Sequence, residues 1–112
     1  MTPTIGKDDL LQNLRDLESA LRSDEVENLM AQQDQVTRQR FVALREQVGI
    51  VVGKLENAQL ADIADQLDRL SPQLNAGIAN MKRALTSIDN AMAIVNTAST
   101  VLTLATNVAA LV

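Results

Sequence analysis

The sequence lacks the residues on which most catalytic and metal sites depend. Its 112 residues include no histidine, cysteine, tryptophan or tyrosine. These absences exclude the commonest general base, thiol nucleophiles, disulfides and most zinc sites. The four glycines stand apart from any Lys-Ser/Thr pair, so they form no phosphate-binding loop. We therefore expect no catalytic residues, no cofactor and no metal ligands, and we predict that the protein is not an enzyme.

Residues that favour strands and turns are also scarce. The chain has one Phe, two Pro and four Gly, whereas Ala, Leu, Gln and charged residues are abundant. Sandwiches and barrels use β-branched and aromatic residues, and they need many turns. The abundant residue types favour helices, and the length fits one domain. The sequence thus predicts a single all-α domain over residues 1–112.

The charge distribution argues against a nucleic-acid partner. Ten basic residues are scattered among fourteen acidic ones, giving a net charge of −4. Binding to phosphates needs a clustered cationic face. The first twelve residues, MTPTIGKDDLLQ, show no cationic start followed by an apolar run. We expect a cytoplasmic protein, or one exported without a cleavable signal peptide.

Apolar spacing and capping residues predict helices at approximately residues 8–22, 24–57, 59–70 and 72–111, after a flexible lead-in at residues 1–6. The first helix has one apolar face, formed by Leu10, Leu14, Leu17 and Leu21. Asp24 with Glu27 resembles a capping box for the second. Ser71 and Pro72 are typical of a helix start, although a kink inside one longer helix fits as well.

The clearest periodicity forms an apolar seam with alternating steps of four and three: Leu74, Ile78, Met81, Leu85, Ile88, Met92 and Val95. Only Gly77 interrupts helix formers between residues 73 and 112. Forty helical residues would be about 60 Å long. We therefore predict an elongated helical hairpin, or a three- or four-helix bundle, with a long C-terminal helix and coiled-coil-like seams. A seam of that length predicts a partner chain, either a second copy or another helical protein.

Gly49 and Gly53 lie four residues apart in a helical pattern. This arrangement lets two helix backbones approach closely, so we predict a close crossing there. A bend or helix end is the alternative, because glycine is unfavourable inside a helix. The apolar run between Glu46 and Lys54 is too short to span a bilayer.

The last 23 residues, 90–112, carry no charged side chain. On a helical wheel the polar residues form one stripe: Asn96, Ser99, Thr100, Thr103, Thr106 and Asn107. A wide opposite arc is apolar: Ile94, Val95, Ala98, Val101, Leu102, Ala105, Val108, Ala109 and Val112. Soluble surface helices usually place Lys and Glu on the polar side. We therefore expect a helix that packs against other helices on both sides.

These patterns favour a non-enzymatic assembly or adaptor protein that acts through self-association or a helical partner. An alternative is a membrane-active oligomer that inserts the tail, a layout similar to that of α-helical pore-forming toxins. A membrane role is not favoured, because a spanning tail would place Asn, Ser and Thr in hydrocarbon without Trp or Tyr at either interface. A second alternative is a small acidic regulatory or immunity-type protein that masks a partner.

Overall fold

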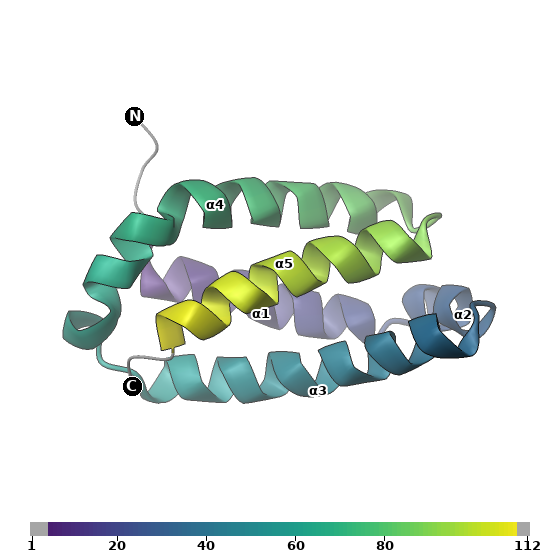
Figure 1. Cartoon of the computed structure of the whole chain (residues 1–112), viewed down its shortest axis with the longest axis horizontal. Coiled ribbons are helices and arrows are strands. Elements are labelled where there is room, and N and C mark those ends of the chain that lie inside the picture. The colour runs from purple at the N-terminus through teal and green to yellow at the C-terminus, as the bar shows by residue number, and fades with distance from the viewer. Residues whose placement is uncertain (1–4, 110–112) are drawn as a thin grey trace.

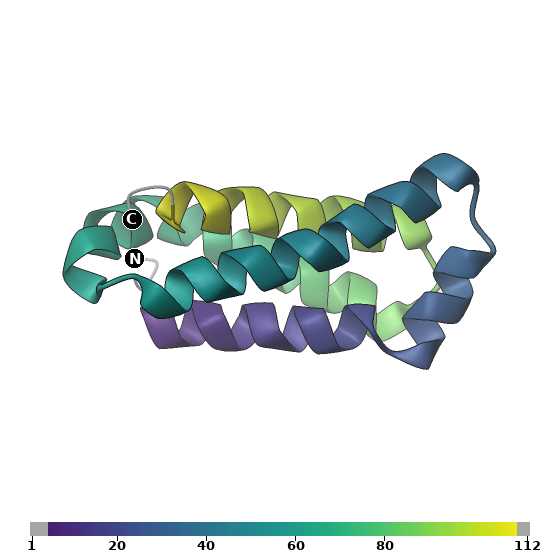
Figure 2. The ribbon, with the colours of Figure 1, turned by 90° about the horizontal axis from the view of Figure 1, so that it is seen from below.

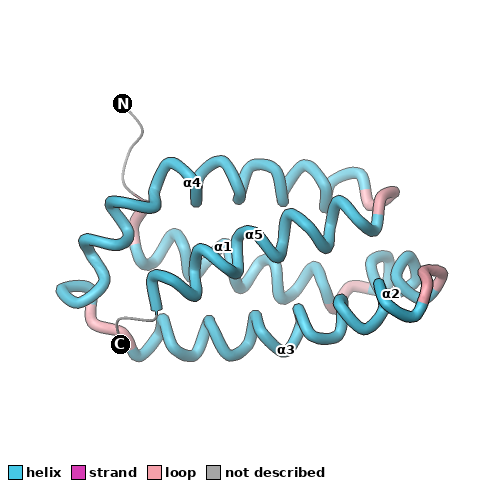
Figure 3. Tube along the Cα trace, viewed as in Figure 1, coloured by secondary structure: helices cyan, strands magenta, loops and turns pink. Residues whose placement is uncertain are grey.

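Helices account for nearly all of the chain between residues 5 and 109, the part that the structure, a computed structural model, describes. They are α1 Lys7–Leu21, α2 Asp24–Ala31, α3 Gln35–Asn57, α4 Leu60–Ser87 and α5 Ala91–Ala109 (Figure 1). Within residues 5–109 there is no strand (Figure 3). The predicted all-α fold class is confirmed, and of the two predicted architectures the bundle is found. Residues 1–4 of the predicted lead-in, the end of the predicted helix 72–111, and Val112 lie outside the described residues.

α1 is held at its start by contacts that the sequence did not predict. Ile5 is buried, and its backbone N–H donates a 2.8 Å hydrogen bond to the Ser71 hydroxyl of α4. The Lys7 ammonium donates to the carbonyls of Glu56 and Ala58 at the end of α3. A cation at a helix C-terminus is stabilising because the last carbonyls lack helical partners. The expected flexible lead-in is therefore wrong at Ile5.

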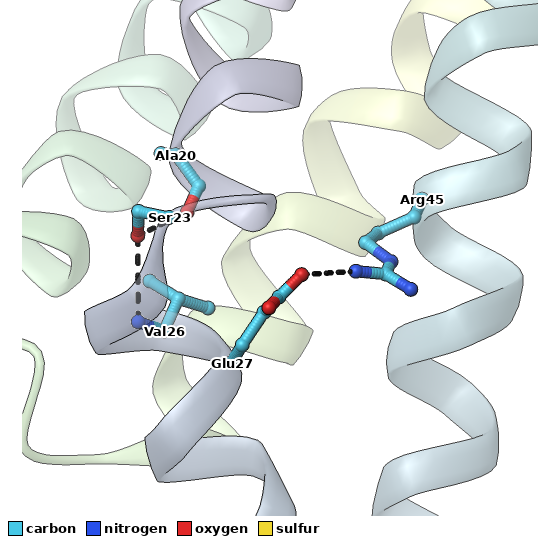
Figure 4. Close-up of polar contacts among 5 residues, drawn as sticks. All are labelled: Ala20, Ser23, Val26, Glu27 and Arg45. Carbon is cyan, nitrogen blue, oxygen red and sulfur yellow. Dashed lines mark hydrogen bonds and ion pairs between the residues drawn. The ribbon is translucent and has the colours of Figure 1, made fainter.

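The predicted helix 24–57 is wrong, because the structure divides it into α2 and α3. α2 begins after Ser23, whose hydroxyl accepts from the Val26 N–H and donates to the Ala20 carbonyl (Figure 4). α2 stops at Ala31, and Asp34 starts α3 by accepting a 2.8 Å hydrogen bond from the Thr37 N–H. An Asp side chain offers the backbone this alternative to a continuing helix. The intervening residues are polar, so little apolar burial is lost by turning there.

α4 runs through Pro72 without a break, so the alternative of a kink inside one longer helix is the one found. The predicted boundary between helices 59–70 and 72–111 is wrong. Pro72 lacks the N–H that continues the helical ladder, and α4 changes direction along its first part (Figure 1). Ser71 is buried, and its hydroxyl donates to the Leu67 carbonyl one turn earlier. Such back-bonding is common in bent helices.

The predicted helix 72–111 is also wrong, because the chain reverses direction at residues 88–90. α4 ends at Ser87 and α5 begins at Ala91. Ile88 adopts the left-handed conformation, with φ 46° and ψ 43°. This conformation costs a β-branched residue on the order of 1–3 kcal/mol. Asn90 then caps α5, since its side-chain oxygen accepts from the Ala93 N–H at 3.1 Å. The expected 60 Å helix is thus folded back on itself.

The four longer helices form a bundle in which α5 lies between α3 and α4, and α1 lies on the opposite side (Figures 1 and 2). α5 packs most extensively against α4, and then against α3. One apolar core runs through the bundle, built from the buried faces of all five helices. The molecule measures 43 × 28 × 19 Å, with a radius of gyration of 13.9 Å. A compact chain of this length has a radius of about 13 Å, so the bundle is only slightly more extended than a compact globule.

Candidate functional site

The predicted apolar seam is divided between two antiparallel helices. Leu74, Ile78 and Met81 are buried on α4, and Val95 is buried on α5. Leu85 and Ile88 are partly buried against the core, whereas Met92 is 43% exposed. The reversal at residues 88–90 turns the two halves toward each other, so most of the seam fills the core of its own chain. The length of the seam alone therefore does not require a partner chain, and association with a partner stays a prediction.

The close helix crossing lies at Gly77, and the prediction for Gly49 and Gly53 is wrong. A Cβ atom at Gly77 would lie 3.3 Å from Cγ2 of Val101 on α5. A Cβ at Gly53 would meet nothing within 4 Å, and one at Gly49 would meet only the Glu18 carboxylate, at 3.4 Å. The small residue that admits a neighbouring helix is thus on α4, where α5 packs.

The apolar arc predicted for the tail is confirmed over the described residues. The buried side chains of α5 are Ala91, Ile94, Val95, Ala98, Val101, Leu102, Ala105, Val108 and Ala109. They fill the space between α3 and α4. The apolar half of the tail is therefore satisfied within the chain, and only the opposite face of α5 remains available to another molecule.

That opposite face carries the predicted uncharged stripe. Asn96, Thr100, Thr103 and Asn107 are exposed, while Ser99 and Thr106 are half-buried. The hydroxyls of Thr100 and Thr106 donate to the carbonyls four residues earlier, at 3.0 and 2.7 Å. Because these donors are already satisfied, they lose little when water is removed from the surface. The stripe therefore offers methyl groups and small polar groups at low desolvation cost.

A groove of about 470 Å³ separates the stripe from α3. Its lining residues are Arg40, Ala43, Leu44, Gln47, Ser99, Leu102, Thr103, Thr106 and Asn107. Arg40 is the single charged residue among them, and its guanidinium donates a 3.1 Å hydrogen bond to Asn96 at the edge of the groove. The groove thus joins one side of α3 to the stripe in a surface with almost no charge.

Exposed apolar side chains extend this surface along α3. Val36 is 65% exposed and Ile50 is 54% exposed. Both fall on the same side of α3 as the groove residues, because positions 36, 40, 43, 47 and 50 repeat at four and three. Met92 adds a third exposed apolar side chain, with its sulfur 3.7 Å from the Thr37 hydroxyl. We call the whole surface, the stripe together with Val36, Arg40, Ala43, Gln47, Ile50 and Met92, the α3–α5 face.

The α3 half of this face was missed from the sequence. The sequence around Val36 and Arg40 has polar residues on nearly every side of the predicted helix, so it shows no clear apolar stripe. The four-three spacing of Val36, Ala43 and Ile50 was the available signal. It is weak because Arg40 and Gln47 occupy the two positions between them.

Two ion pairs lie on the other side of α3, toward α1 and α2. Arg15 meets Glu56 at 2.9 Å, and Arg45 meets Glu27 at 2.8 Å (Figure 4). Arg45 also lies 5.0 Å from the centre of the Phe41 ring. Exposed pairs of this kind add at most about 1 kcal/mol each. Charge is therefore used on the α1 side of the bundle and is nearly absent from the α3–α5 face.

The described residues offer no arrangement that invites chemistry. Across residues 5–109, no group of three or more carboxylates is placed to hold a metal ion. Asp62, Asp65 and Asp68 are all exposed on α4. The pKa of Asp34 is held below its usual value by hydrogen bonds from the Thr37 side chain and backbone, and this carboxylate serves as the cap of α3. The α3–α5 face is the surface on which a function can be argued.

Comparison with known proteins adds no relative. No family model, no curated protein and no solved structure matches the chain. Function must therefore be argued from the surface itself.

Proposed function

We propose that the chain is a non-enzymatic helical association protein that binds a second copy of itself through the α3–α5 face. The observation that carries this proposal is the composition of that face. α5 exposes Thr100, Thr103 and Asn107 without a charge beside them, along a groove whose single charged lining residue is Arg40. Soluble helices normally protect their exposed side with Lys and Glu, and this chain uses charges freely on its other helices.

The face suits a second copy because it is nearly uncharged. When identical faces meet about a two-fold axis, residue i of one copy contacts residue j of the other and j contacts i, so a face with an excess of one charge sign meets the same excess. A charged face would then bring like charges together, which destabilises the contact. Here only Arg40 carries charge, and it is already turned toward Asn96. Small Ser and Thr side chains also allow two helices to approach closely.

The size of the face predicts weak association. α5 has 19 described residues and is therefore about 28 Å long. With the adjoining side of α3, whose axis lies 8–10 Å away, the face is about 20 Å wide. Each copy would bury about 550 Å², close to the lower limit for a specific interface. We therefore expect a dimer that dissociates at micromolar concentrations.

The test is Thr103→Lys, at the middle of the stripe. Thr103 is exposed in the single chain, so the variant should keep its stability within about 0.5 kcal/mol. In the dimer the new charge would be buried without a partner, which costs several kcal/mol. Sedimentation equilibrium should show a dissociation constant at least about tenfold higher, since tenfold is 1.4 kcal/mol.

The matched control is Ser19→Lys, an exposed small polar residue on α1 at the opposite side of the bundle. It adds the same charge and should leave the dissociation constant unchanged. If both variants weaken association equally, net charge rather than the α3–α5 face controls it. If the parent chain is monomeric at every concentration, self-association is wrong, and a different helical protein becomes the candidate occupant.

Membrane insertion by α5 is the second candidate function. α5 is the one helix within residues 5–109 that is long and apolar enough to cross a membrane, with a mean hydropathy of 1.3. Its apolar side chains fill the core in this fold, so insertion requires α5 to leave α3 and α4. Dye release from phosphatidylcholine–phosphatidylglycerol vesicles tests this candidate. Release by the parent that Thr103→Lys abolishes would favour it over association in solution.

A further inference from the structure

The connection between α4 and α5 has an unusual backbone. Only Ile88, Asp89 and Asn90 join the two helices, and none of them is glycine or proline. Ile88 has φ 46°, the single positive φ among the non-glycine residues from 5 to 109. A β-branched side chain is strained in the left-handed region, where glycine or asparagine is usual. The tight turn is therefore made by a residue poorly suited to it.

The apolar pattern of the sequence continues through this turn without a change of phase. Met81, Leu85, Ile88, Met92 and Val95 repeat at four and three, so they would lie on one side of a straight helix. The hairpin does not use this alignment fully. Leu85 and Ile88 are only partly buried, and Met92 is 43% exposed. The sequence at the turn therefore suits a straight helix better than it suits a hairpin.

We propose that α4 and α5 join into one straight helix in a domain-swapped dimer, in which α5 of each chain packs between α3 and α4 of a second copy. Every contact that α5 makes in the single chain is then made between chains. The left-handed Ile88 is released, and Leu85, Ile88 and Met92 of the two copies meet near the two-fold axis. The continuous helix runs from Leu60 to Ala109 and keeps the bend near Pro72, and its part after Pro72 is about 55 Å long.

The packing around Gly77 identifies the occupant of the interface as a second copy. Val101 lies 3.3 Å and Thr100 3.9 Å from where a Cβ of Gly77 would be. A site that fits these side chains this closely is complementary to α5 of this chain, and identical copies present the same site to each other. Short, strained hinge loops favour such exchange over a closed monomer.

This inference does not rest on the α3–α5 face. Of the α3–α5 face the swap uses only Met92, and the rest of that face stays exposed on each of the two bundles of the swapped dimer. Self-association through the face and exchange of α5 can therefore be tested separately. The α4–α5 contacts stay within each chain when two copies associate through the face, and they are made between chains in the swapped dimer.

The experiment unfolds the full chain at high concentration, refolds it, and measures mass by light scattering after size exclusion. Two variants of the α4–α5 turn should change the dimer fraction in opposite directions from the parent. Ile88→Gly accepts the left-handed turn and should lower the dimer fraction about tenfold. Asp89→Ala with Asn90→Ala removes the cap that only the hairpin needs and supplies helix formers, so it should raise the dimer fraction.

A cross-link distinguishes the swap from face-to-face association. Asn80 on α4 and Thr97 on α5 line the same groove, away from the α3–α5 face. The chain has no cysteine, so Asn80→Cys with Thr97→Cys and a short thiol-to-thiol cross-linker gives one defined link. Links between chains in the isolated dimer are expected. If the links stay within one chain, the swap is wrong and the proposed association through the face survives. If neither the parent nor the Asp89→Ala/Asn90→Ala variant dimerises on refolding, the swap is also wrong.

Discussion

Replacing Gly77 by leucine should destabilise the protein, and the same replacement at Gly53 should not. At Gly77 the first added carbon would lie 3.3 Å from Cγ2 of Val101, closer than the 3.5–4.0 Å of ordinary carbon contacts. Three further carbons then have no free space between α4 and α5. Overpacking of this kind costs about 1–3 kcal/mol. At Gly53 nothing lies within 4 Å, and replacing a helical glycine gains about 0.5–1 kcal/mol.

These energies convert to clear shifts in melting temperature. The entropy of unfolding is about 2.1 cal/mol/K per residue, so for 112 residues 1 kcal/mol corresponds to about 4 °C. Gly77→Leu should melt about 4–12 °C below the parent, and Gly53→Leu should melt at or slightly above it. Thermal unfolding followed by far-ultraviolet circular dichroism measures both. If the two variants lose the same amount of melting temperature, Gly53 also lies at a close helix crossing. If the melting temperature of Gly77→Leu equals that of the parent, the packing of α4 against α5 at Gly77 is wrong.

Two further predictions concern polar side chains that fix helix ends. Ser71→Ala leaves the buried N–H of Ile5 without its acceptor. The free energy of unfolding measured with urea should therefore fall by about 1–3 kcal/mol. An unchanged free energy would show that this hydrogen bond is not made. The hydrogen bonds from Thr37 hold the pKa of Asp34 below its ordinary value of 3.8. The stability that the Asp34 charge adds is therefore complete above about pH 3.8, and it is lost as the pH falls through the lower pKa of the folded state. Asp34→Asn keeps a neutral cap, and the difference in melting temperature between the parent and this variant should therefore shrink in acid and vanish once Asp34 is protonated.

The buried faces of the helices could be predicted from the sequence, whereas the ends of the helices could not. Leu10, Leu14, Leu17 and Leu21 are all fully buried on α1, and the apolar arc of α5 fills the core. Periodicity determines these faces, because residues three and four apart lie on one side of any helix. It contains no information about where a helix stops when the stop is made by ordinary residues, as after Ala31 and at Ile88.

The glycine prediction failed for a related reason. Gly49 and Gly53 form a recognisable pair, but a close crossing needs a second helix opposite, and α3 turns that side toward solvent and the Glu18 side chain. Gly77 has no second glycine near it in the sequence, and it lies at a close contact only because α5 folds back onto α4. The contacts of a glycine depend on tertiary arrangement, which the spacing of glycines alone does not specify.

The reversal at Ile88 shows how burial overrides local preference in this chain. A straight α4–α5 helix in a single molecule would leave the apolar side of α5 in water. Fully burying one Val, Leu or Ile is worth about 1.5–3 kcal/mol, and α5 buries Ile94, Val95, Val101, Leu102 and Val108. Their sum exceeds the 1–3 kcal/mol cost of a left-handed Ile88, so the isolated chain folds back. In the proposed swapped dimer a second copy would change this balance, because it would supply the same burial to a continuous helix and remove the strain at Ile88. If the proposed swap occurs, concentration selects between the two forms, and the periodicity that predicted one long helix fits the swapped form.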